Sequence, residues 1–95
     1  MRKNDLKATF KSAKKNNDNY IVVFIHMIDY PEEEMIINEK NNFENKLKYY
    51  DEAYNEELHL VFNDGIYITE SISFNNFTEM KTIIKNHKEF IKNNE

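Results

Sequence analysis

Residues 42–62 constrain the fold more than any other stretch, because they predict an amphipathic helix that leads directly into a strand. Large apolar side chains recur there at helical spacing, at Phe43, Leu47, Tyr50 and Tyr54. Asn42 is placed to cap the helix, and we expect the helix to end near Asn55. Three of the four core candidates are aromatic, so this helix is expected to hold much of a small core together.

The remaining elements follow from apolar periodicity and turn residues. They are a helix at 4–16, strands at 20–28, 34–38, 58–62 and 66–73, and a helix from residue 77. Strand 20–28 is apolar on both faces, which is typical of a central strand. Residues 63–65, with the single Gly, predict the turn between the last two strands.

One residue conflicts with the pattern of the fourth strand. Glu70 falls on the face that Ile66, Ile68, Ile72 and Phe74 would share in a regular strand. A bulge, an edge position or a shorter strand would explain this charge.

The predicted order α-β-β-α-β-β-α indicates an α+β fold. We expect a two-layer sandwich in which the helices pack on one face of a four-stranded, mainly antiparallel sheet. The 95 residues suffice for one core, so residues 1–95 are predicted to form a single domain.

Composition argues against an enzyme, a cofactor or a membrane segment. The chain has no Cys and only one Gly, which excludes thiolate chemistry and the Gly-rich loops that hold dinucleotides or phosphates. The histidines, His26, His59 and His87, fall in three different elements without metal-ligand spacing. The longest apolar run is too short to span a bilayer. Because a chain without Cys fits a reducing compartment, we expect a cytoplasmic protein.

Charge is segregated along the chain. Residues 1–15 carry a net charge of +5, and residues 29–79 a net charge of −10. Ordinary solubility charge would explain both segments. The functional interpretation is an acidic surface with exposed tyrosines as anchors for a basic partner. Its candidate residues are Tyr30, Glu32, Glu33, Glu34, Tyr49, Asp51, Glu52, Glu56 and Glu57.

Two alternatives remain open. The basic first helix could contact nucleic-acid phosphates through Lys7, Lys11 and Lys14, although Arg2 is the only Arg in the chain. The sheet could instead serve a small-ligand or homodimeric binding module.

A sequence resemblance suggests a biological context. The stretch EMIINEKNNFENKLKYYDEAYNEELHL, followed by NDGIYI, resembles small proteins that phages and mobile elements of low-G+C Gram-positive bacteria encode. Small acidic proteins of this kind often inhibit host machinery, including anti-CRISPR proteins that occupy nucleic-acid-binding surfaces. The resemblance therefore implies a non-enzymatic inhibitor of a host protein or ribonucleoprotein, most directly a CRISPR effector, acting in the host bacterial cytoplasm. It assigns no role to any residue.

Overall fold

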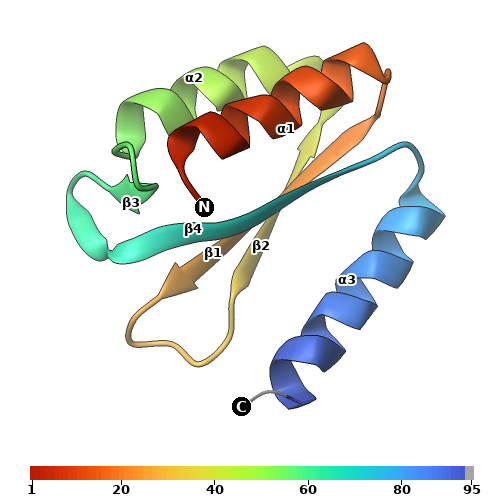
Figure 1. The fold of residues 1–95 in the computed structure, drawn as a ribbon. Helices are drawn as coiled ribbons and strands as arrows, with labels where there is room; N and C mark the ends of the chain where they lie inside the picture. The colour runs from red at the N-terminus through yellow and green to blue at the C-terminus, as the bar shows by residue number, and fades with distance from the viewer. Residues whose placement is uncertain (94–95) are drawn as a thin grey trace.

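The structure is a computed structural model that describes the backbone of residues 1–93 and the side chains of residues 1–86. Its elements are α1 (Lys3–Lys15), β1 (Tyr20–Met27), β2 (Glu34–Glu39), the 3-10 turn η1 (Lys40–Asn42), α2 (Phe43–Ala53), β3 (His59–Leu60), β4 (Asn63–Phe74) and α3 (Phe77–Asn93) (Figure 1). The strands form one antiparallel sheet in the order β2-β1-β4-β3. The predicted element order and the α+β class are confirmed.

Helices cover both faces of the sheet (Figure 1). Ile21 and Val23 of β1 pack in the core formed with α1 and α2. Val22 and Phe24 point to the opposite face, where they pack against Met80 of α3. This corrects the expected arrangement, since α3 adds a third layer. The physical reason is the apolar pattern of β1, which would expose two fully buried side chains if one face were left open.

The α2 helix carries the aromatic core predicted for it. Phe43 and Tyr50 are buried, and the Phe10 ring of α1 contacts the Phe43 ring with centroids 5.8 Å apart. The Asn38 amide is also buried, and it donates to the Ile21 carbonyl at 3.2 Å and to the Tyr50 hydroxyl at 3.4 Å. These bonds satisfy the one amide side chain buried among the described residues of this core.

A bulge in β4 explains the misplaced Glu70. The register of β4 against β1 shifts by one residue at Thr69, which has no partner in the ladder. Before the bulge, Ile68 packs with the α1 and α2 core; after it, Ile72 and Phe74 pack with α3. Of the three explanations considered for Glu70, the structure shows the bulge, and the apolar residues of the strand do not share one face as expected. Glu70 lies exposed.

The third strand is shorter than predicted. The chain turns at residues 61–62, which places Leu60 opposite Asn63, and residues 63–65 begin β4 instead of forming the turn. A tertiary contact contributes to this change, because Val61 donates its N–H to the Ala53 carbonyl at the end of α2, at 2.8 Å. The Asn55 side chain accepts the N–H of His59 at 3.0 Å in the preceding tight turn.

Asparagines lie at the end of α1 and at the start of α3. Asn17 follows α1 at φ 58°, in the left-handed region that ends helices, as predicted for this segment. Asn76 Oδ1 accepts the N–H of Glu79 at 2.8 Å and caps α3. Asn42 makes no side-chain cap bond, in contrast to the prediction, because η1 already winds the chain into α2. Within residues 1–93, no helix has both the length and the apolar character needed to cross a membrane.

Candidate functional site

The β1–β2 loop and the β3–β4 turn lie at the same end of the sheet (Figure 1). Ile28, just beyond β1, donates its backbone N–H to the carbonyl of Gly65 in β4 at 2.9 Å. Antiparallel pairing accounts for this proximity, since the end of β1 meets the starts of both β2 and β4. We call the surface formed by residues 28–33 and 61–65 the hairpin end.

Large apolar side chains stand in solvent at the hairpin end. The exposed fraction is 93% for Phe62, 71% for Ile28, 60% for Tyr30 and 59% for Val61. Phe62 and Val61 are exposed because they occupy the turn between β3 and β4, where side chains project beyond the sheet. Single exposed apolar residues are ordinary, but four within two neighbouring loops mark a surface suited to a partner.

A small pocket lies beside Ile28 and Tyr30. It has a volume of about 80 Å³ and is lined by Met27, Ile28, Asp29, Tyr30, Asn63, Gly65 and Ile66. Sites for small organic ligands usually measure roughly 300–1,000 Å³. This pocket is therefore of a size to receive one side chain of a partner.

The hairpin end also carries four carboxylates. They belong to Asp29, Glu32, Glu33 and Asp64. The sequence has no Lys or Arg in 16–39 or in 49–80, so the two chain segments that build this end are purely acidic. The Glu33 carboxylate accepts the Thr69 hydroxyl at 2.7 Å, which ties the β1–β2 loop to the bulge in β4.

Of the predicted partner-binding residues, the structure brings Tyr30, Glu32 and Glu33 together at the hairpin end. Glu34 is the first residue of the edge strand β2, directly after the β1–β2 loop, and Tyr49 lies on α2. The Tyr49 ring contacts the Tyr54 ring with centroids 6.5 Å apart. Burial raises the pKa of Tyr54 to about 12, with smaller contributions from the neighbouring tyrosines and from the charge of Glu34.

The predicted acids of α2 and the loop after it are partly engaged within the molecule. Asp51 Oδ1 lies 3.0 Å from Lys7 Nζ and 3.6 Å from Lys3 Nζ. The hydrogen bond and charge of Lys7 hold the pKa of Asp51 below its ordinary value. Glu56 lies 3.9 Å from Lys3 Nζ. The other two predicted acids, Glu52 and Glu57, are exposed and form no ion pair with a described residue.

The lysines of the first helix that were predicted as an alternative nucleic-acid site also differ in their surroundings. Lys7 is held by Asp51, whereas Lys11 and Lys14 are exposed and form no ion pair with another described residue. Lys3 was not predicted as a buried residue, but it is buried and donates from Nζ to the Asp51 carbonyl at 2.8 Å. Its position near the start of a Lys-rich helix gave no local signal of burial.

Two of the three histidines contact the same tyrosine in the sheet. His26 and His59 flank Tyr67, with ring centroids 5.1 Å and 4.8 Å from the tyrosine ring. Sequence spacing could not reveal this stack, because the register of three strands creates it. Among the described residues, no three His, Cys, Asp or Glu side chains gather as metal ligands. The side chain of His87 lies outside the described residues.

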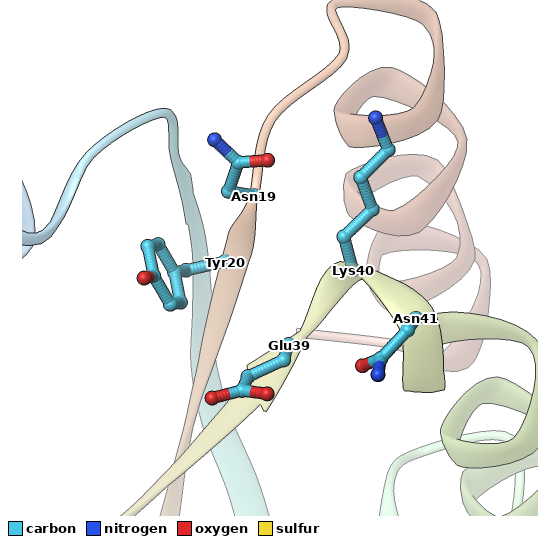
Figure 2. A pocket seen from close by; sticks show the side chains of 5 residues that line it. All are labelled: Asn19, Tyr20, Glu39, Lys40 and Asn41. Atoms are coloured by element: carbon cyan, nitrogen blue, oxygen red, sulfur yellow. The ribbon is translucent and has the colours of Figure 1, made fainter.

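A second, shallow pocket lies at the opposite end of the sheet. Figure 2 shows its lining residues, which come from the segment before β1, the start of β1, the end of β2 and η1: Asn19, Tyr20, Glu39, Lys40 and Asn41. Their side chains point in different directions rather than toward a common centre (Figure 2). Binding sites for small molecules have convergent polar groups, so we do not assign a ligand to this pocket.

The sequence analysis did not single out Phe62, Val61 or Ile28. It placed Phe62 inside a strand in alternation with Leu58 and Leu60, and the turn that exposes it contains neither Gly nor Asn. Comparisons with protein-family models, with curated proteins and with solved structures found no match for this chain.

Proposed function

We propose that this protein is a non-enzymatic binding module that docks its hairpin end onto a basic surface of a partner protein. The observation that carries the proposal is Phe62, which is 93% exposed at a turn whose neighbours are carboxylates and other apolar side chains. An aromatic anchor with a charged rim is the composition of a specific protein interface.

Charge complementarity supports a partner with a basic surface. A surface built from segments without Lys or Arg repels nucleic-acid phosphates and attracts clusters of Lys and Arg. Such clusters line proteins that bind nucleic acid. The pocket beside Ile28 and Tyr30 offers a place for one side chain of that partner.

The proposed target class is a host nucleoprotein, with a CRISPR effector as the first candidate. The channel of such an effector is positively charged because it holds a guide–target duplex by its backbone. An acidic module with an apolar anchor could occupy that channel. This target choice follows from the resemblance to phage and mobile-element proteins.

The test compares variants of the hairpin end with a matched charge reversal elsewhere. Phe62→Ser removes the anchor, Glu32→Lys reverses a charge of the hairpin end, and Glu44→Lys reverses an exposed charge at the start of α2 as the control. Binding to purified effector complexes is measured by pull-down at low and high salt. Inhibition is measured as survival of a targeted plasmid in a CRISPR-bearing host.

We expect the wild-type protein and Glu44→Lys to bind at low salt and to protect the plasmid. Phe62→Ser should weaken binding about tenfold or more, as expected for a residue central to an interface. Glu32→Lys should weaken binding most at low salt, as expected for a charge in the rim. Equal binding by all four proteins would contradict the assignment of the hairpin end. Retention of DNA or RNA that Lys11→Glu abolishes would favour the first helix instead.

A further inference from the structure

The outer edge of β2 presents free backbone groups. In an antiparallel ladder, residues alternate between those that bond to the neighbouring strand and those whose N–H and C=O point away. Lys40 donates its N–H to the Asn19 carbonyl at 2.9 Å, so alternate residues before it also bond to β1: Asn38, Ile36 and Glu34. The outward-pointing backbone groups therefore belong to Met35, Ile37 and Glu39.

β2 lacks most of the features that protect natural edge strands, which are charged side chains, especially Lys, as well as Pro, a bulge or a covering element. It has no Lys or Pro, and its pairing with β1 is regular throughout Glu34–Glu39. Its charges are confined to its two ends, at Glu34 and Glu39, and the residues between them are uncharged. No described residue outside β1 bonds to its backbone N–H groups.

Apolar side chains also stand on both sides of the edge. Ile37 is 48% exposed on the face that α3 covers only in part. Tyr49 is 48% exposed on α2, and its ring lies 5.5 Å from that of Tyr50, whose hydroxyl accepts from the Asn38 amide of β2 at 3.4 Å. The edge therefore combines unpaired backbone groups with apolar surface above and below it, which suits another strand.

We infer that two copies of this chain pair through β2, antiparallel and across a two-fold axis at Ile37, to form a continuous eight-stranded sheet. The outward-pointing N–H and C=O groups of one β2 strand must bond to those of the other, which leaves three registers to consider. The inferred register places Ile37 opposite itself and Glu34 opposite Lys40 of the other copy. A shift toward the strand start would oppose Glu33 to Glu39, and the reverse shift would oppose Ile37 to Glu39.

Charge and packing select the register centred on Ile37. Opposite charges across an antiparallel pair are favourable and like charges are unfavourable, which rejects the register that faces Glu33 with Glu39. Glu34 and Lys40 belong to the same alternation and lie on the α1 side of the sheet, where Figure 2 shows Lys40 extending beside α1. Within its own chain, Lys40 Nζ donates to Asn17 Oδ1, so in the dimer the Glu34 carboxylate of the other copy would share this ammonium with Asn17 or displace it. The two-fold axis creates this pair twice, and it brings the two exposed Ile37 side chains together.

This dimer is independent of the proposed binding function. The antiparallel arrangement would leave both hairpin ends free, at opposite ends of the extended sheet. A failure of the dimer would not remove the hairpin end as a binding surface, and a failure of partner binding would not affect the mass of the protein in solution.

The test is a charge swap read by sedimentation equilibrium over a wide range of protein concentration. We expect wild-type protein to show twice the mass of one chain at high concentration. Glu34→Lys alone and Lys40→Glu alone should each raise the dimer Kd about tenfold, because each creates like-charged pairs. The double variant should restore the wild-type Kd. A wild-type monomer at all concentrations, or a double variant no tighter than the singles, overturns the inference.

A backbone variant tests the edge itself. Ile37→Pro removes an N–H that points away from β1, so the fold should survive while the dimer is lost. Ile37→Thr keeps the N–H and is the control that should still dimerise. Hydrogen exchange gives an independent readout: the amides of Met35, Ile37 and Glu39 should become protected in the dimer. Unprotected amides at concentrations where the mass has doubled would overturn pairing through β2.

Discussion

Lys7 Nζ lies 3.0 Å from Asp51 Oδ1, which joins the basic first helix to the acidic middle of the chain. Lys3 approaches the same carboxylate from one turn earlier on α1. Two charge segments that look independent in the sequence therefore neutralise each other in part where α1 packs beside α2. At the hairpin end, Asp29, Glu32 and Asp64 form no ion pair with a described Lys or Arg.

The Lys7–Asp51 pair predicts a pH-dependent contribution to stability. Because Lys7 lowers the pKa of Asp51 from 3.8, the pair stabilises the fold above that pH, and its contribution is lost as the pH falls through the lowered pKa. Lys7→Ala should cause a small loss of stability at pH 7 that disappears in acid. Urea unfolding at both pH values measures this, with Lys11→Ala as the control. An equal loss at both pH values would contradict the assignment.

Lys3 is expected to matter more than any other lysine of α1. Its buried ammonium donates to the carbonyl of Asp51, one of the carbonyls that the end of α2 leaves without a helical partner. Lys3→Met keeps most of the buried stem but removes this bond, at a cost of about 1.5–3 kcal/mol. Lys14→Met, on the exposed side, should change stability by less than about 0.5 kcal/mol. Similar values for the two variants in urea unfolding would show that Lys3 is not buried.

Adjacent residues of β1 test the third layer. Val22 and Val23 are both fully buried, but they face α3 and the α1–α2 layer respectively. Val22→Ala and Val23→Ala should each destabilise the protein by about 2 kcal/mol, since each removes buried methyl groups. Thermal unfolding followed by circular dichroism gives both values. A Val22→Ala variant as stable as the wild type would mean that α3 does not cover this face.

Alkaline titration tests the tyrosine cluster. Burial raises the pKa of Tyr54 to about 12, above the ordinary value of 10.0. Stability from this group is therefore present below pH 10 and is lost as the pH rises toward 12, because the unfolded chain ionises first. Tyr54→Phe should make the alkaline decline in stability shallower. Tyrosinate absorbance of the folded protein reports the titration directly, and a normal titration of all six tyrosines would contradict the burial of Tyr54.

Phe62 should contribute to binding but not to stability. Its side chain is 93% exposed, so Phe62→Ser should change the free energy of unfolding by less than about 0.5 kcal/mol. In contrast, Phe74 is buried against α3, and Phe74→Ala should cost about 3–5 kcal/mol. Chemical denaturation of the two variants makes the comparison. A large loss in Phe62→Ser would show that the turn packs against the protein.

Local patterns in the sequence were enough to predict the elements and their order. Helical spacing located α2 and its aromatic core, and β-branched runs located β1 and β2. The misplaced Glu70 indicated an irregularity in β4, with a bulge as one of three explanations. These features depend on interactions between residues close in the chain, which local periodicity records. The apolar pattern on both faces of β1 also contained the signal for a third layer, although we expected two.

Which side chains are exposed on the surface depends on contacts between distant parts of the chain. The turn at residues 61–62 depends on a bond from Val61 to the end of α2, and the exposure of Phe62 follows from it. The Lys7–Asp51 pair joins residues far apart in sequence. Strand register and helix docking are set by contacts between distant segments, and a one-residue shift moves every side chain to the other face. The sequence could therefore indicate an acidic protein, but not which acidic residues remain free to meet a partner.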